Sequence, residues 1–188
     1  MIDAAVARRI RLVAFDVDGV LTDAGVYIGV AGAQPVELKR FDVQDSIGIY
    51  LLRLMGFKLA IVSGRVSQAT AIRAAELGID DVFQDGRAAK LPAFEALLER
   101  QGVSAAETAF LGDDLPDIPV LERVGLPVTV HNGVAEVRAV ARYTTAARGG
   151  HGAVREFAEA LLKARGEWDL AVDRYLAERG ATREARHA

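Results

Sequence analysis

The stretch Leu12-Val-Ala-Phe-Asp16-Val-Asp18-Gly-Val-Leu-Thr22 decides the fold. Residues 12–17 are apolar except for Asp16, as in a strand of a parallel sheet that is buried on both faces. Two carboxylates follow with one residue between them, and Gly19 opens a turn. Ligands of open parallel sheets bind beyond the carboxyl ends of the strands. We therefore expect Asp16 and Asp18 to share one pocket, with one as nucleophile and the other as general acid. The alternative is that both merely form the turn.

The rest of the chain alternates short apolar runs with helical patterns. The predicted strands are 12–17, 58–62, 81–83, 108–111 and 126–130, and the predicted helices are 46–55, 66–77, 88–101, 117–124 and 134–141. Gly78, Gly102 and Gly125 fall where these helices should end, and Ser104-Ala-Ala-Glu107 is a capping-box pattern. The alternation predicts an α/β fold, a Rossmann-like parallel sheet with helices on both faces.

Two segments break the alternation. Residues 26–30 and 36–41, joined by the loop 31–35, predict a β-hairpin at about 25–41. After residue 142, Arg148-Gly-Gly-His-Gly152 leads into helices at 153–164 and 167–179 and a frayed tail. We expect one domain over residues 1–188, with the C-terminal segment beginning near residue 146.

Composition excludes several classes of function. The 188 residues are 51% hydrophobic and 26% charged, with a net charge of −3, which predicts no basic face for nucleic acid. There is no cysteine for disulfides or thiolate chemistry. The apolar stretch near the N-terminus is too short for a signal peptide, and no run approaches the ~20 residues of a membrane span. We expect a cytoplasmic protein without nucleic-acid or membrane partners.

Polar residues also follow two other predicted strands. Ser63-Gly64-Arg65 can offer a hydroxyl and a backbone N–H to a phosphoryl oxygen, although Ser-Gly is also an ordinary turn. Asp113, Asp114 and Asp117 place three carboxylates within five residues. Their repulsion raises their pKa values unless a cation lies among them, and this favours a metal site. Asp117 can alternatively be part of an acidic first helical turn.

Other readings of these motifs fare less well. An EF-hand loop beginning at Asp16 needs oxygen ligands where the chain has Val20 and Tyr27. Neither of the common glycine-rich nucleotide-binding motifs follows a predicted strand. Lys90 lies near a helix start, where the helix dipole disfavours a cation unless an anion is near. A bound phosphate or the carboxylates would supply that anion; a solvated surface lysine is the alternative.

Taken together, the four motifs resemble the haloacid dehalogenase superfamily of phosphatases. They are Asp16-x-Asp18-Gly-Val-Leu-Thr22, Ser63-Gly-Arg65, Lys90 and Gly112-Asp-Asp-x-x-Asp117. Within it the chain is similar to the 3-deoxy-D-manno-octulosonate-8-phosphate phosphatases over residues 11–162. That similarity includes Phe41-Asp-Val-Gln-Asp45 and Gly149-Gly-His-Gly-Ala-Val-Arg-Glu156.

The resemblance implies a role for each motif residue. Asp16 would be the nucleophile that becomes an aspartyl-phosphate, and Asp18 the general acid and base. Mg²⁺ would be held by Asp16, the Asp18 carbonyl and Asp113. The remaining implied residues bind phosphate (Ser63, Gly64, Lys90), support the site from behind (Asp114, Asp117) or contact the sugar (Arg65, Arg148, Gly150, Arg155).

The implied reaction is hydrolysis of an acidic sugar phosphate in lipopolysaccharide biosynthesis. Asp45-Ser46 and His151 depart from the residues common in the family, Asp-Gly and a basic residue. Both lie near the expected sugar site, so a nonulosonate 9-phosphate remains an alternative substrate. A catalytically silent assembly subunit and a phosphomutase are rival functions, although all the motif residues are present.

The gaps between the motifs leave no room for a cap domain. The first gap holds only the hairpin and one helix, and the second only one helix and one strand. The resemblance implies a homotetramer in which hairpins associate and subunits cover each other's sites. The alternative is a hairpin folded back on its own sheet. The resemblance also implies that residues 148–155 form a tail that reaches a neighbouring subunit's site; a plain linker is the alternative.

Overall fold

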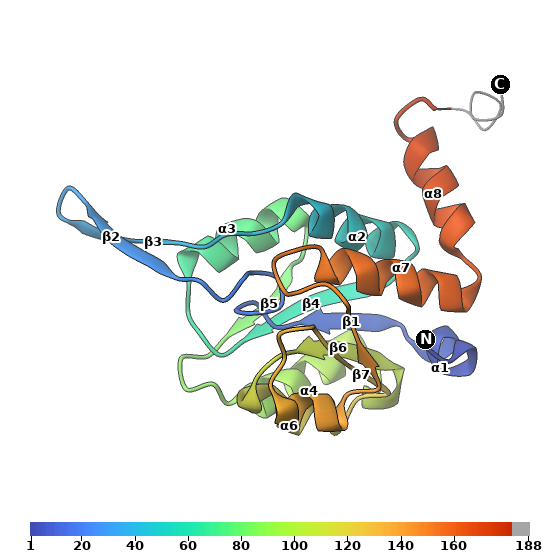
Figure 1. Cartoon of the computed structure of the whole chain (residues 1–188), viewed down its shortest axis with the longest axis horizontal. Coiled ribbons are helices and arrows are strands. Elements are labelled where there is room, and N and C mark those ends of the chain that lie inside the picture. Colours follow the sequence, from blue (N-terminus) through green and yellow to red (C-terminus); the bar gives the residue numbers. More distant parts are fainter. Residues whose placement is uncertain (182–188) are drawn as a thin grey trace.

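The computed structural model describes residues 1–181, and a six-stranded parallel sheet lies at its centre (Figure 1). The strands are β1 (Leu12–Phe15), β4 (Lys58–Ser63), β5 (Asp81–Gln84), β6 (Thr108–Gly112), β7 (Leu126–Thr129) and β8 (Tyr143–Thr144). They lie in the order β5-β4-β1-β6-β7-β8, and every neighbouring pair is parallel. The predicted α/β fold is confirmed.

The order of the strands reverses direction beside β1. From β1 the chain builds β4 and β5 on one side, and then crosses to β6, β7 and β8 on the other. Strands β1 and β6 pair with Phe15 opposite Leu111, so Asp16 and Asp113 lie just beyond the same edge. Such a switch point opens a crevice at the carboxyl ends of the strands. The topology therefore places the first and last motifs side by side.

Helices cover both faces of the sheet (Figure 1). One face carries α2 (Val43–Leu54), α3 (Gln68–Leu77) and α7 (Ala153–Arg165), and the other carries α4 (Lys90–Gln101), α5 (Ile118–Leu121) and α6 (Ala135–Val140). Two short helices, α1 (Ala4–Arg9) and α8 (Trp168–Ala177), lie near the ends. In β1, Val13 and Phe15 enter the first core while Leu12 and Ala14 enter the second. Burial on both faces explains the continuous apolar run.

All the predicted strands and helices are present, with ends that differ by a few residues. The Ser104–Glu107 capping box is confirmed, and Gly78 and Gly102 end α3 and α4 in the left-handed conformation. Gly125 is not a helix end, because α5 is capped at Glu122. It is glycine because a Cβ there would lie 2.1 Å from the carbonyl oxygen of Ala106.

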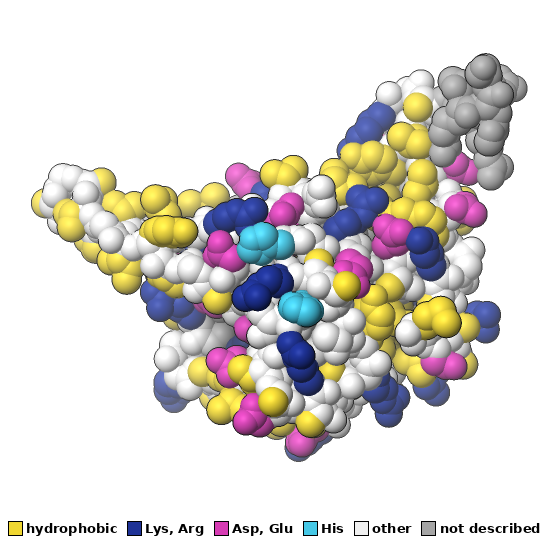
Figure 2. Space-filling view, viewed as in Figure 1, with side chains coloured by type: hydrophobic (Ala, Val, Ile, Leu, Met, Phe, Trp, Pro, Cys, Tyr) yellow, Lys and Arg dark blue, Asp and Glu magenta, His cyan; other side chains and the backbone are white. Residues whose placement is uncertain are grey.

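The predicted hairpin consists of β2 (Tyr27–Ala31) and β3 (Gln34–Leu38), a separate two-stranded sheet. Pairing continues to Ala31 and Gln34, so the turn has two residues and the five-residue loop was wrong. Gly32 supplies a φ of 65°, as such tight turns require. The hairpin projects from the body (Figure 1) and hydrophobic side chains line it (Figure 2). It does not fold back on the central sheet.

The segment after the last strand is not a detachable tail. Helix α7 packs against α2 and lies in the core through side chains that are wholly buried: Val154, Phe157, Ala158, Leu161 and Leu162. Helix α8 extends away from the body (Figure 1), and the expected frayed tail lies mostly outside the described residues. No helix within residues 1–181 has the length and apolar character to cross a membrane.

A buried carboxylate joins α2 to the start of α7. Asp45 is 2% exposed and its Oδ1 accepts a hydrogen bond of 2.8 Å from the backbone N–H of Arg155. Its Oδ2 is buried without a hydrogen-bond partner in the described part of the chain. Burial, above all, raises the pKa of Asp45 to about 6. The folded protein therefore holds a proton here more strongly than the unfolded chain does.

We expect Asp45→Asn to stabilise the protein at pH 7 and to flatten its stability between pH 4 and 6. A raised carboxyl pKa means that the folded state binds more protons in this window, so stability falls as pH rises through it. The neutral amide can still accept the Arg155 N–H. The expected gain at pH 7 is on the order of 1–3 kcal/mol, measured by urea unfolding at pH 4 and 7. If the free energy of unfolding changed equally with pH in the wild type and in Asp45→Asn, this prediction would be contradicted.

Candidate active site

The loop after β1 is shaped by a glycine and a threonine. Gly19 has a φ of 97°, and a Cβ there would lie 2.0 Å from Oδ2 of Asp113. The Thr22 hydroxyl donates to the Val17 carbonyl at 3.2 Å and accepts from the Gly19 N–H at 3.3 Å. The turn is thus closed by its own residues, and the lack of a side chain at Gly19 brings the Asp113 carboxylate against the loop.

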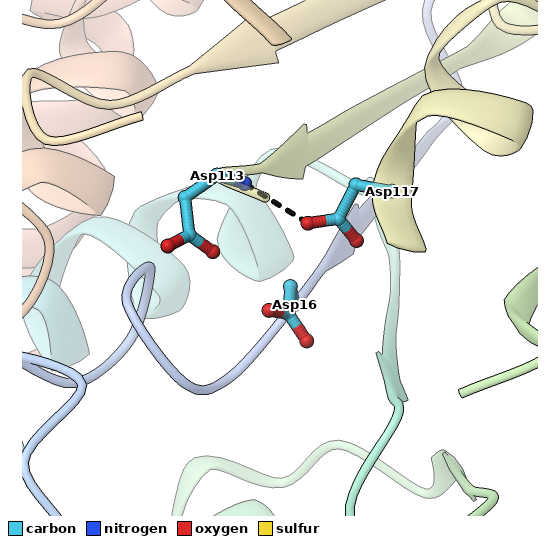
Figure 3. A group of neighbouring side chains, drawn as sticks. All are labelled: Asp16, Asp113 and Asp117. Carbon is cyan, nitrogen blue, oxygen red and sulfur yellow. Dashed lines mark hydrogen bonds between the residues drawn. The ribbon is translucent and has the colours of Figure 1, made fainter. Parts of the chain in front are cut away.

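Three carboxylates face one another, Asp16 and Asp113 at the ends of β1 and β6 and Asp117 in the short 3-10 helix Leu115–Asp117 that follows β6 (Figure 3). Asp16, Asp113 and Asp117 each bring an oxygen within 4.8 Å of the others. Asp117 is already occupied: Oδ1 accepts from Lys90 at 2.6 Å, and Oδ2 accepts the N–H groups of Asp113 and Asp114 at 2.9 and 3.2 Å. In contrast, Oδ1 of Asp113 is buried and has no hydrogen-bond partner among residues 1–181. Asp16 and Asp113 therefore fit a bound cation, and Asp117 fits a supporting role.

The electrostatics of the carboxylates point the same way. Burial, followed by the charge of Asp117, raises the pKa of Asp16 to about 7. Burial, followed by Asp16 and Asp117, raises the pKa of Asp113 to about 8. The single lysine among them cannot neutralise the negative charge of three clustered carboxylates. A divalent cation would remove this penalty, and carboxylate oxygens are the ligands that Mg²⁺ prefers.

Lys90 is the cation within this cluster. It begins α4, is 5% exposed, and its Nζ lies 2.7 Å from Oδ1 of Asp16 and 2.6 Å from Oδ1 of Asp117. Burial alone would lower the pKa of Lys90, but the two carboxylates more than offset it and raise it. The alternative of a solvated surface lysine is wrong. The anions that we expected near this helix start are the carboxylates themselves.

Most of the predicted site residues line one hollow of about 180 Å³. Its lining includes Asp16, Asp18, Ser63, Gly64, Arg65, Lys90, Asp114 and Asp117. Ser63 is buried at the end of β4, where its hydroxyl accepts from the Arg65 N–H and donates to the Arg65 carbonyl, both at 3.2 Å. The Arg65 guanidinium is held by Glu37 of the hairpin at 2.6 Å.

The other three predicted substrate-binding residues do not line this hollow within one chain. Arg148 is exposed. Gly150 packs on the loop after β1, where its N–H donates to the Val20 carbonyl at 3.0 Å. The side chain of Arg155 stacks on Trp168, 5.4 Å from the ring centre. Their predicted contact with the sugar therefore stays a prediction.

The glycine segment is attached to the site of its own chain. Asn132 donates to the Gly19 carbonyl at 3.0 Å and accepts from the Gly149 N–H at 2.7 Å. A Cβ on Gly149 would lie 1.7 Å from the carbonyl oxygen of Gly19. The glycines that suggested a flexible tail allow this close approach, so the segment holds the loop after β1 in place.

Sequence reasoning missed two site residues on the hairpin. The Nζ of Lys39 lies 2.7 Å from Oδ1 of Asp18, and Glu37 binds both Arg65 and the hydroxyl of Ser67. A signal was present: the chain has only four lysines, and the rarity that drew attention to Lys90 applied to Lys39 as well.

Comparisons with known proteins agree with this geometry. The haloacid dehalogenase-like hydrolase family model matches residues 82–157. The 3-deoxy-D-manno-octulosonate 8-phosphate phosphatase of Escherichia coli is 42% identical over 167 residues, 89% of this chain and 87% of that protein. The corresponding protein of Yersinia pestis is 40% identical over 158 residues, 84% of this chain and 82% of that protein.

Solved structures are similar over nearly the whole chain. The Moraxella catarrhalis phosphatase, in complex with magnesium, phosphate and the sugar acid KDO, has a TM-score of 0.83 at 39% identity, covering 90% of this chain and 95% of that one. The cobalt-bound phosphatase of Haemophilus influenzae has a TM-score of 0.81 at 33% identity, covering 88% and 94%.

Proposed function

We propose that this chain hydrolyses 3-deoxy-D-manno-octulosonate 8-phosphate to the free sugar acid and inorganic phosphate. The chain belongs to the phosphatases of that sugar phosphate, which are haloacid dehalogenase-like hydrolases. The observation that carries this proposal is the cluster of Asp16, Asp113 and Lys90 beside Asp18 at the switch point of the sheet. It combines a nucleophile, a cation site and a phosphate-binding lysine.

In the first step, the Asp16 carboxylate attacks phosphorus and the ester P–O bond breaks. The leaving sugar oxygen takes a proton from Asp18. Asp16, Asp113 and the Asp18 main-chain carbonyl would hold Mg²⁺, which neutralises the charge of the approaching phosphate. Lys90 and Ser63, with the Gly64 N–H, hold the phosphoryl oxygens, and Asp117 keeps Lys90 aimed at them.

In the second step, water hydrolyses the aspartyl-phosphate. Asp18 accepts a proton from the water, whose oxygen attacks phosphorus. The bond between phosphorus and the Asp16 oxygen breaks, so inorganic phosphate leaves and the carboxylate is restored. The environment of Asp18 must therefore let it both give and take a proton.

We further propose one hydrolase domain over residues 1–188, a cytoplasmic location and a homotetramer. The absence of cysteine is consistent with a reducing compartment.

The proposed homotetramer is supported by the hollow and by the hairpin. The hollow of about 180 Å³ is smaller than the roughly 300–1,000 Å³ of typical ligand sites. The hairpin exposes 77% of Ile28 and 74% of Val30. An isolated hairpin is only marginally stable, so neighbouring copies are its natural cover, and light scattering of the full chain measures this.

The test of the proposed function is a panel of phosphate esters assayed by phosphate release with Mg²⁺. It contains 3-deoxy-D-manno-octulosonate 8-phosphate, sialate 9-phosphate, its deaminated analogue, a neutral hexose phosphate and p-nitrophenyl phosphate. We expect the first to have the highest kcat/KM. A higher value for either nonulosonate phosphate would transfer the function to that substrate. No turnover of any ester would favour the silent assembly subunit.

Two variants separate sugar contact from loop support in the glycine segment. We expect Arg148→Ala to lower kcat/KM for the sugar phosphate by roughly tenfold and to leave p-nitrophenyl phosphate unaffected, because remote contacts help only substrates that reach them. Gly150→Ala should lower both rates together. Gly150 has a φ of 65°, and a Cβ there would lie 2.4 Å from the backbone nitrogen of Asp23.

Both variants are measured in steady state, with light scattering to verify assembly. A proportional loss on both esters for Arg148→Ala would remove it from the substrate site. Truncation after Thr145 is not a usable test, because it removes the core helix α7.

A further inference from the structure

The arm of the hairpin that returns to the body carries two charged residues toward the active site. Glu37, in β3, and Lys39, one residue beyond its end, are two positions apart. Successive side chains of extended chain point to opposite sides, and Leu38 between them is 63% exposed. Glu37 contacts Arg65 and Ser67, and Lys39 contacts Asp18. The arm therefore has an apolar outer side and a charged side on the catalytic loops.

Lys39 contacts both oxygens of one carboxylate. Its Nζ donates a hydrogen bond of 2.9 Å to Oδ2 of Asp18 and lies 2.7 Å from Oδ1, which has no hydrogen-bond partner among residues 1–181. The side chain of Lys39 is 0% exposed, whereas that of Asp18 is 25% exposed. Lys39 also lies 3.4 Å from the hydroxyl of Thr70 on α3 and 3.8 Å from Glu37. The buried ammonium group of Lys39 thus contacts the Asp18 carboxylate on one side, while part of Asp18 stays open toward the hollow.

This contact matters because Asp18 lies on a loop, and its side-chain bonds could otherwise rotate freely. A general acid or base must come within about 2.6–3.2 Å of the proton that it transfers. A misplacement of about 1 Å can cost roughly 100-fold in rate. A carboxylate oxygen has two lone pairs, so a contact with Lys39 leaves capacity for the substrate oxygen or water. Lys90 cannot replace Lys39 here, because it is committed to Asp16 and Asp117.

We propose that Lys39 is a positioning residue that fixes the Asp18 carboxylate for proton transfer, so that the hairpin is part of the catalytic apparatus. The proposal rests on the function proposed above. Lys39 acts on the water step through Asp18: water gives its proton to Asp18, its oxygen attacks phosphorus, and the bond to Asp16 breaks. A poorly placed Asp18 slows this step for every substrate.

Phosphoryl transfer from p-nitrophenyl phosphate to Asp16 needs little help from Asp18, since p-nitrophenolate is a good leaving group that needs little protonation. This substrate therefore isolates the effect of Lys39 on the second step. In Lys39→Met the first step should stay within about threefold of wild type. Hydrolysis of the aspartyl-phosphate should fall by roughly 10- to 100-fold, up to the lower limit of the roughly 10²–10⁴-fold that general acid–base catalysis contributes, because Asp18 is misplaced and not removed. Stopped-flow release of p-nitrophenolate should become biphasic, with a burst near one equivalent per site.

Four further proteins complete the experiment: Lys39→Arg, Lys58→Met, Asp18→Asn and the double variant of Asp18→Asn with Lys39→Met. Lys39→Arg restores a cation and should recover much of the steady-state rate. Lys58→Met is the matched control, because Lys58 is a lysine outside the site that donates to the Gln101 carbonyl, and it should behave as wild type. In an Asp18→Asn background, Lys39→Met should have almost no additional effect, since coupled residues are not additive.

The outcomes separate the two proposals. A proportional fall of the burst and the steady rate in Lys39→Met, or a full additional loss in the Asp18→Asn background, would overturn the role of Lys39 and leave the phosphatase intact. If Lys39→Met does not fold, Lys39→Gln replaces it, both alone and in the Asp18→Asn background. A wild-type protein without Mg²⁺-dependent phosphate release from any ester of the panel would overturn the proposed function, and the role of Lys39 with it.

Discussion

Asp16→Asn is expected to lower kcat by on the order of 10³-fold or more, as loss of a covalent nucleophile does. An amide is a far poorer nucleophile and metal ligand than a carboxylate. The fold should survive, because the amide oxygen can still accept from Lys90, which lies 2.7 Å from Oδ1. Steady-state phosphate release measures the loss of rate. After an acid quench, the variant should carry no covalently bound phosphate.

Asp80→Asn is the matched control. Asp80 is an exposed acid just before β5, at the opposite end of the sheet from the site. It should keep the full rate, which shows that loss of an acid as such is harmless. If Asp16→Asn keeps a tenth of the wild-type rate, Asp16 is not the nucleophile.

Removal of divalent cations should abolish activity, and Ca²⁺ should not restore it. Asp16 is buried and Asp113 is partly buried, each has a carboxylate oxygen within 4.8 Å of the other, and Oδ1 of Asp113 has no hydrogen-bond partner within residues 1–181. Mg²⁺ imposes tight octahedral geometry at about 2.0–2.1 Å, whereas Ca²⁺ takes more and longer bonds. The longer bonds would move the attacking oxygen of Asp16 away from phosphorus.

The measurement is phosphate release after EDTA treatment, followed by titration with Mg²⁺ or Ca²⁺. Asp113→Asn should raise the Mg²⁺ concentration for half-maximal activity by roughly tenfold or more, since a carboxylate ligand becomes an amide. Asp80→Asn is again the control and should leave this concentration unchanged. Full activity in EDTA, or equal rates with both cations, would exclude this account of the site.

The sequence predicted the sheet and the motif residues at its edge because both follow from local patterns. A parallel strand buried on two faces must be a continuous apolar run, so the residues that end it are easy to locate. Short elements gave no such signal. Helix α1 has six residues and β8 two, and β8 is defined only by pairing with β7.

The parts that sequence could not predict depend on contacts between distant segments. Lys39 meets Asp18 across 21 positions, through the path of a hairpin whose direction no local pattern encodes. Gly149 approaches Gly19 across the width of the fold, so glycines that a local reading assigns to flexibility serve close packing. The length of the hairpin turn was missed because Pro35 suggested a loop, whereas it pairs with Val30 in a two-stranded sheet.

The central place of β1 has a consequence for synthesis on the ribosome. Its neighbours are β4 and β6, so Val13 and Phe15 lack one flanking strand until residue 111 has been made. The loop after β1 then waits for Asn132 and Gly149 before it is closed. Contacts so distant in sequence form slowly, and domains generally fold as units. Strand β1 therefore lacks a flanking strand until about three-fifths of the chain has been made, and the loop after β1 is not closed until about four-fifths has been made.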